Sequence, residues 1–116
     1  MASVQKTYAL VLGLVLALVG VWGFFTNSIL GILGVNALQS VLHLIAAGFG
    51  IYAGTKGDGT TYNQVLGLIA IVLGVIGFIP GVSDLLLRLL NINTAITVLH
   101  VAICVVTLGV YYGVKE

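Results

Sequence analysis

The chain has 116 residues, of which 6% are charged, whereas a soluble domain carries roughly 25% charged residues. Hydrophobic residues make up 60% of it and the mean hydropathy is +1.25, which is more apolar surface than one domain of this length can hide from water. The net charge of +1 leaves no basic stripe for phosphate contacts. These values exclude a soluble globular domain and a nucleic-acid partner, and they predict that lipid surrounds the protein.

Three stretches lack charged residues, namely 7–55, 59–83 and 89–114. Because a membrane helix needs roughly 20 residues, the first stretch holds two spans, separated by turn-forming residues near 26–28. We therefore predict one all-α transmembrane domain, residues 1–116, with four helices at about 7–25, 36–54, 61–79 and 93–113. A signal peptide is the alternative for the first span, but its apolar run is longer than the usual core of roughly 7–15 residues.

The second half of the sequence repeats the first. An offset of 54 aligns residues 7–24 with 61–78 and gives 10 identical positions of 18. After a three-residue insertion, an offset of 57 places Asn36 and His43 on Asn93 and His100. Since each copy holds an even number of spans, we predict two parallel helical hairpins, 1–57 and 58–116, related by a pseudo-two-fold axis along the membrane normal.

With four spans, we expect both termini to lie on the same side of the membrane, together with the loop between the second and third helices. That side holds Lys6, Lys56 and Lys115, whereas the other side holds Arg88. Because positively charged loops stay inside, we expect cytoplasmic termini and a multi-pass protein of the cell membrane.

The connections on the opposite side are mostly apolar. We expect both of them, residues 27–33 and 82–90, to lie in the membrane interface, where an apolar face rests on acyl chains. Ser83 is placed to cap a short helix in the second connection, with Asp84 and Arg88 paired four residues apart.

His43 and His100 are the only histidines, and each follows an asparagine by seven residues inside a predicted span. An ionisable group inside a membrane indicates either a function or a specific partner. One interpretation is a neutral imidazole that links helices by hydrogen bonds to neighbouring polar groups, with Asn36, His43, Asn93 and His100 acting as polar pins and Gln39, Ser40 and Thr97 as further partners. The alternatives are a haem held by both histidines and a proton or metal-ion site.

Glycine occurs 16 times, about twice its average frequency. Small residues spaced along a span allow helix backbones to approach each other, so we assign helix packing to Gly13, Gly20, Gly23, Gly50, Gly54, Gly67, Gly74, Gly77, Gly109 and Gly113. None of these glycines follows a strand or opens a phosphate-binding loop, so a nucleotide site is not predicted.

No acid and base stand together in a span, because Asp58, Asp84 and Glu116 are the only carboxylates and all three lie outside the predicted spans. We therefore expect no catalytic activity, no metal and no soluble small-molecule substrate. A structural, accessory or self-associating role is favoured, with lipid, a second copy or a larger membrane complex as partner. The alternative is a redox, ion-handling or proton-handling protein that uses both histidines.

The doubled hairpin, with Gly-Phe at the end of the first helix and Asn then Leu-His in the second, resembles a family of small prokaryotic membrane proteins known as domain of unknown function 4383. The matching positions are Gly23-Phe24, Asn36 and Leu42-His43, repeated as Gly77-Phe78, Asn93 and Leu99-His100. The resemblance implies four spans and no established reaction.

Overall fold

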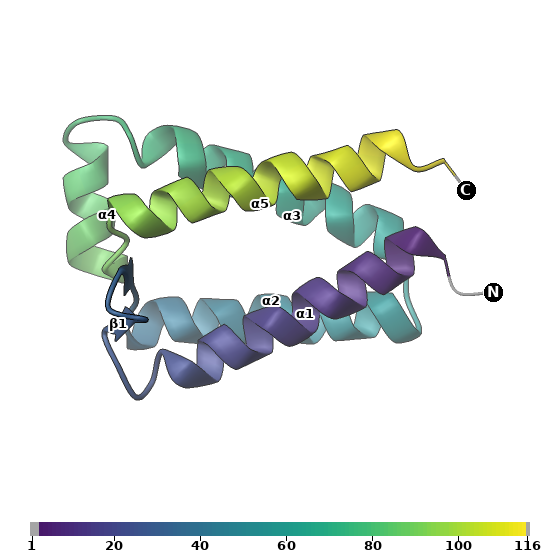
Figure 1. Cartoon of the computed structure of the whole chain (residues 1–116), viewed down its shortest axis with the longest axis horizontal. Helices are drawn as coiled ribbons and strands as arrows, with labels where there is room; N and C mark the ends of the chain where they lie inside the picture. Colours follow the sequence, from purple (N-terminus) through teal and green to yellow (C-terminus); the bar gives the residue numbers. More distant parts are fainter. Residues whose placement is uncertain (1–2, 116) are drawn as a thin grey trace.

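In the computed structural model, which describes residues 3–115, five helices and one small antiparallel sheet form an elongated body (Figure 1). The elements in chain order are α1 Val4–Trp22, β1 Ser28–Ile29, β2 Leu33–Gly34, α2 Ala37–Thr55, α3 Gly59–Ile76, α4 Val82–Leu90 and α5 Thr94–Gly113. The prediction of an all-α polytopic membrane protein is confirmed.

Four helices of the described chain, α1, α2, α3 and α5, are long and apolar enough to cross a membrane. Their lengths of 18 to 20 residues correspond to about 27–30 Å, which matches the hydrocarbon core of a bilayer. Large apolar side chains cover their outward faces, including Leu18 at 63% and Val105 at 66% exposure. Such a surface is stable only in contact with lipid.

The predicted spans are present, but their ends are displaced by a few residues. The side chain of Ser3 accepts a hydrogen bond from the backbone N–H of Lys6, so α1 begins before the charge-free stretch and ends at Trp22. Asp58 caps α3 in the same way, and this helix ends at Ile76 with Gly77 as its C-cap. The side-chain caps of Ser3 and Asp58 therefore set where these helices begin.

Helices α1 and α2 form one close hairpin, and α3 and α5 form the other (Figure 1). A Cβ atom on Gly13 would lie 2.8 Å from the backbone nitrogen of Ile51, and one on Gly67 would lie 2.5 Å from the side chain of Leu108. These two contacts correspond at the offsets that align the two halves of the sequence.

The same correspondence continues along both hairpins. Gly20 lies against Leu44, and Gly74 against Val101. Further along, Gly23 contacts Ser40 and Gly77 contacts Thr97, again at positions that differ by the same two offsets. The two hairpins therefore use equivalent residues to bring their helices together.

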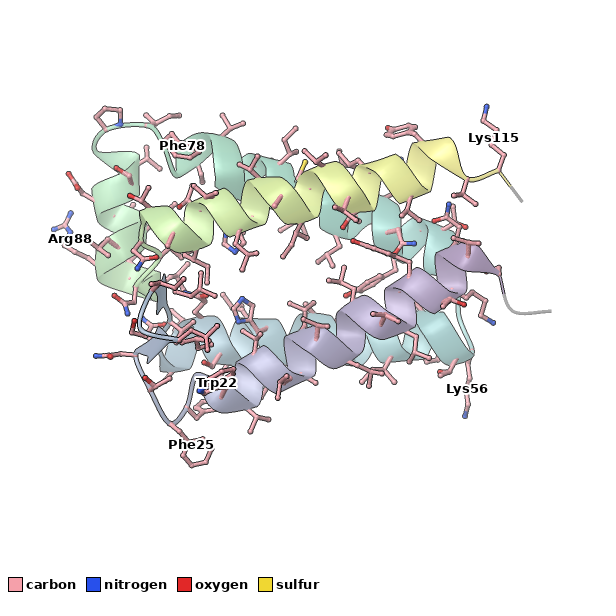
Figure 2. The ribbon with its side chains drawn as sticks, viewed as in Figure 1. Trp22, Phe25, Lys56, Phe78, Arg88 and Lys115 are labelled. Atoms are coloured by element: carbon pink, nitrogen blue, oxygen red, sulfur yellow. The ribbon has the colours of Figure 1, made fainter. Side chains whose placement is uncertain are left out.

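The chain termini and the α2–α3 connection lie at one end of the bundle, which we call the terminal end (Figure 1). The sheet and α4 lie at the other, which we call the loop end. Figure 2 shows Lys56 and Lys115 at the terminal end and Trp22, Phe25, Phe78 and Arg88 at the loop end. The distribution of positive charge expected from the sequence is thus present.

The first connection at the loop end, which we expect to lie in the membrane interface, contains a β-hairpin that the sequence analysis did not predict. Ile29 pairs with Leu33, and the backbone of Ile32 donates to the carbonyl of Ile29. Leu30 and Gly31 both have positive φ, 56° and 75°, which is the geometry of a tight hairpin turn. Only Gly31 indicates this turn in the sequence, since leucine rarely adopts a positive φ.

The second connection contains the expected short helix, α4, but its predicted details were wrong. Gly81, with a φ of 87°, is the N-cap, while Ser83 lies inside the helix and its N–H donates to the carbonyl of Ile79. Asp84 and Arg88 form no ion pair in the described chain.

Both connections enclose a small apolar core at the loop end. Its buried members are Ile29, Val35, Ile92 and Ile96, with Leu33, Leu86, Leu90 and Val19 packed around them. The connections thus pack against each other and join the two hairpins, in addition to any contact with the membrane surface.

Candidate functional site

Asn36 and Asn93 have two roles each at the loop end. The side-chain oxygen of each caps its own helix, accepting from Gln39 N at 2.8 Å and from Ile96 N at 3.0 Å, respectively. The side-chain nitrogen of each donates to the opposite hairpin, Asn36 to Leu89 O and Asn93 to Ile32 O, both at 2.9 Å. The structure therefore places both asparagines at helix starts, not inside the spans, and each one links the hairpins.

Two further amides strengthen this junction. Gln39 Nε2 donates to Leu90 O at 2.7 Å and to Gly34 O at 3.1 Å. Asn91, in the left-handed conformation that ends α4, donates to the carbonyls of Asn27 and Val35 at 2.9 and 2.8 Å. Our sequence reasoning named Gln39 only as a partner for histidine and missed Asn91.

The terminal end has its own polar contacts, which the sequence analysis missed. Gln5 Nε2 donates to Val110 O at 2.8 Å and to Val114 O at 3.1 Å near the end of α5. Asn63 Nδ2 donates to the backbone and side-chain oxygens of Gln5, at 3.0 and 2.9 Å. A signal was available, since an amide in an apolar span needs a partner.

Two tyrosine side chains, one from each hairpin, contact the opposite hairpin. Tyr8 on α1 shares a 2.6 Å hydrogen bond with the hydroxyl of Thr107 on α5. Tyr62 on α3, at the equivalent position, donates to Ala46 O on α2 at 2.9 Å and lies against Gly50. Gly50 and Thr107 are themselves equivalent positions, so each tyrosine contacts the same site on the opposite hairpin.

His43 and His100 are partly buried on α2 and α5, at equivalent positions of the two halves. The Nδ1 atom of each is buried and has no hydrogen-bond partner. Our expectation that neighbouring polar groups bond to these imidazoles was therefore wrong for Nδ1. Three of the expected partners bond elsewhere, since Asn36 and the Gln39 nitrogen donate across the junction and Thr97 donates to Asn93 O.

Two more unpartnered polar atoms lie on the same stretch of α2. Gln39 Oε1 and Ser40 Oγ are buried without a partner, in side chains that are 3% and 0% exposed. The orientation of the Gln39 amide follows from its nitrogen, which donates to two carbonyls. We call these four atoms, Gln39 Oε1, Ser40 Oγ, His43 Nδ1 and His100 Nδ1, the acceptor cluster.

The acceptor cluster differs from an ordinary metal centre. Residues 3–115 contain no group of three or more His, Cys, Asp or Glu side chains placed to bind a metal ion. Cys104 is a buried free thiol. A divalent ion at the cluster would have only neutral ligands in a medium of low dielectric constant, which is energetically unfavourable.

The predicted packing glycines fall into two groups. A Cβ atom would meet another part of the chain within 4 Å at Gly13, Gly20, Gly23, Gly50, Gly54, Gly67, Gly74 and Gly77. At Gly109 and Gly113, as well as at Gly48, it would meet nothing within that distance. These three glycines therefore face away from the other helices of the described chain.

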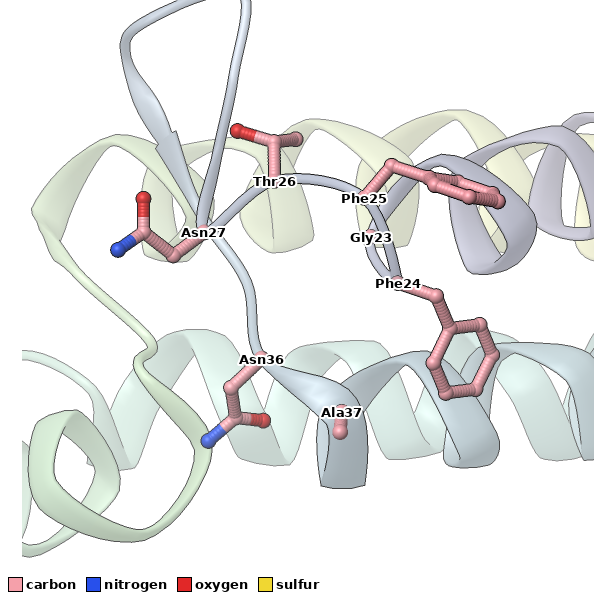
Figure 3. Close-up of a pocket in the computed structure, with 7 residues that line it drawn as sticks. All are labelled: Gly23, Phe24, Phe25, Thr26, Asn27, Asn36 and Ala37. Atoms are coloured by element: carbon pink, nitrogen blue, oxygen red, sulfur yellow. The ribbon is translucent and has the colours of Figure 1, made fainter.

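A pocket of about 610 Å³ opens at the loop end between the end of α1 and the start of α2 (Figure 3). Its lining consists of Gly23, Phe24, Phe25, Thr26, Asn27, Asn36 and Ala37. Figure 3 shows the polar side chains of Asn27 and Asn36 on one side of it and the two phenyl rings on the other. Gly23 also contacts the hydroxyl of Ser40, so the pocket wall touches the acceptor cluster.

Outside the spans, Asp58 is the carboxylate with a defined environment. The hydroxyl of Thr61 donates to it at 2.6 Å, and the backbone N–H groups of Thr60 and Thr61 donate at 3.0 and 3.3 Å. These hydrogen bonds lower the pKa of Asp58 below its usual value, chiefly through the Thr61 side chain.

The model of the family described as "Domain of unknown function (DUF4383)" matches residues 6–113, which is nearly the whole chain. The chain belongs to this family. The resemblance seen in the sequence is thereby confirmed. No curated protein and no solved structure matches it.

Proposed function

We propose that this family member is a structural or accessory unit of the cell membrane, which acts through contacts with lipid and with neighbouring membrane helices and catalyses no reaction. The observation that supports this most directly is the reciprocal bonding of Asn36 to Leu89 and of Asn93 to Ile32. These bonds, together with the shared core, fix the two hairpins to each other at the loop end. Because the two hairpins are held together in this way, their outward-facing helix surfaces keep a fixed arrangement for contact with lipid or with another protein.

Self-association is the form of contact that the outward glycines support. Gly48 and Gly109 lie in spans and face away from the rest of the described chain, so a helix of a second copy can approach their backbones closely. Cysteine substitution tests this in a Cys104→Ala background. Oxidative cross-linking of the membrane-embedded protein is expected at Gly48→Cys or Gly109→Cys and not at the exposed control Leu68→Cys. Equal or absent cross-linking at all three positions would contradict self-association through these faces.

The distribution of lysine and arginine residues supports one orientation of the two hairpins across the membrane. Lys6, Lys56 and Lys115 support cytoplasmic termini under the positive-inside rule, with Arg88 outside. In intact cells, an impermeant thiol reagent is expected to label Arg88→Cys and not Lys56→Cys, both in the Cys104→Ala background. The reverse pattern would overturn this orientation.

A second candidate function, redox chemistry or the handling of ions or protons by the two histidines, is favoured by one observation. His43 Nδ1 and His100 Nδ1 are buried at equivalent places and remain unpartnered, which is costly in a membrane unless something else occupies them. Proton or ion flux into liposomes that is lost on His43→Ala or His100→Ala would support this function. Flux equal to that of empty liposomes would exclude it for the ions tested.

A further inference from the structure

Four buried polar atoms of the acceptor cluster need hydrogen-bond donors that residues 3–115 do not supply. Gln39 Oε1 is an acceptor, and His43 Nδ1 and His100 Nδ1 are acceptors when each neutral imidazole carries its proton on Nε2. Ser40 Oγ has no partner either. In high-resolution structures such groups are nearly always paired with protein or with ordered water. The cost of leaving them unpaired rises in a membrane, where lipid offers no donor.

Three of the four atoms lie within two turns of α2, and the fourth, His100 Nδ1, lies on α5 at the position that corresponds to His43. Ser40 precedes His43 by three residues and Gln39 precedes it by four, so all three side chains lie along adjacent faces of α2. A water molecule bonds well where two to four polar partners surround it, which this cluster provides.

An open pocket at the loop end lies next to Ser40, the member of the cluster nearest to it. The open pocket between α1 and α2 has Gly23 in its wall, and Gly23 lies directly against Ser40 Oγ. The pocket also contains the polar side chains of Thr26, Asn27 and Asn36. In the second hairpin the corresponding hydroxyl, that of Thr97, donates to Asn93 O and is satisfied. Of these two equivalent hydroxyls, only that of Ser40, in the first hairpin, is left without a partner among residues 3–115.

We propose that the acceptor cluster is a binding site for water, which enters through the pocket at Gly23, bonds to Ser40, and hydrates His43 and His100. The ligand is neutral water and not a metal ion, because no carboxylate or thiolate stands in the cluster to balance a cation. This inference deepens the second candidate function, since such water would bring exchangeable protons to both imidazoles.

Thiol accessibility tests the proposal directly. In nanodiscs and in a Cys104→Ala background, Ser40→Cys is expected to react with a charged methanethiosulfonate reagent about tenfold faster than Ala47→Cys or more. Ala47 is a matched control, because it is buried on the same helix and its backbone faces Gly13 of α1 as Ser40 faces Gly23. Equal labelling rates would overturn the proposal.

A second measurement leaves the cluster unchanged. In the ¹⁵N-histidine-labelled protein, NMR is expected to show Nδ1 unprotonated and magnetisation exchange between water and both imidazoles. Absence of exchange would overturn the proposal, and so would a stoichiometric shift of both imidazole signals on adding Zn²⁺ that abolishes the water exchange, since the site would then be a metal site. Hydrated imidazoles without liposome flux would uphold the water site while excluding the proton-handling function.

Discussion

The side chain of Asn36 caps α2 with its oxygen and, with its nitrogen, donates to the carbonyl of Leu89, which lies 53 residues further along the chain. One amide thereby starts a helix and holds the neighbouring hairpin.

Substitution of Asn36 separates these two roles. Loss of a cap costs about 0.5–2 kcal/mol, and loss of a hydrogen bond costs about 0.5–1.5 kcal/mol more, so Asn36→Ala is expected to lower the free energy of unfolding by about 1–3 kcal/mol. Asn36→Asp keeps the capping oxygen and removes the donor to Leu89, so its loss should be smaller. Denaturant unfolding in mild detergent measures both, and wild-type stability in Asn36→Ala would be inconsistent with the junction described.

Glycine substitutions distinguish packed positions from open ones. A Cβ atom on Gly13 would lie 2.8–3.0 Å from backbone atoms of α2, which cannot move aside, so Gly13→Ala should destabilise the protein by about 1–3 kcal/mol. Gly48→Ala, measured on the monomer in detergent so that no second copy covers this face, is the control, because its Cβ atom meets open space and alanine is the better helix former by about 0.5–1 kcal/mol. Thermal unfolding of the two variants should shift in opposite directions, and a shared direction would contradict the packing.

The hydroxyl pair of Tyr8 and Thr107 connects α1 of one hairpin to α5 of the other. A double-mutant cycle with Tyr8→Phe and Thr107→Val should give a coupling free energy of about 0.6 kcal/mol, the average for such bonds in a membrane. Tyr8→Phe paired with Thr97→Val supplies the comparison, since Thr97 bonds to Asn93 O instead. Coupling of the same size in that pair would mean that the value does not report the hydrogen bond.

Acid should weaken the cap of α3. Because hydrogen bonds lower the pKa of Asp58 in the folded protein, the charged carboxylate stabilises the fold at pH values above its unfolded pKa. That contribution decreases as the pH falls below the unfolded pKa and is lost once the pH passes the lower, folded pKa. The difference in free energy of unfolding between wild type and Asp58→Ala should therefore decrease in acid. In a Thr61→Val background this decrease should occur at a higher pH, because the Thr61 hydroxyl no longer lowers the pKa of Asp58. A difference that is independent of pH would contradict this cap.

The spans could be predicted because they depend on local properties, namely the length of charge-free stretches and turn residues near 26–28. The ends shifted because caps such as Ser3 outweigh the position of Lys6. The junction at the loop end could not be predicted, since Asn93 and Ile32 are far apart in sequence and meet only after both hairpins form. Leu30 is a further example, because its positive φ follows from the closure of the hairpin and not from its own preference.

The partner groups of the histidines were the least predictable part of the candidate site. The asparagines and Gln39 have several possible acceptors, and only the three-dimensional structure shows that backbone carbonyls of the other hairpin occupy them. The Nδ1 atoms of His43 and His100 have no hydrogen-bond partner among residues 3–115.

The most direct test of the central claim, that this protein acts through contacts and holds no catalytic cofactor, is an optical and metal-content measurement. The protein purified in mild detergent is compared with the His43→Ala/His100→Ala double variant. We predict that both are colourless and contain no stoichiometric metal. A haem absorption band or a bound metal ion that is present in the wild type and lost in the variant would contradict the claim.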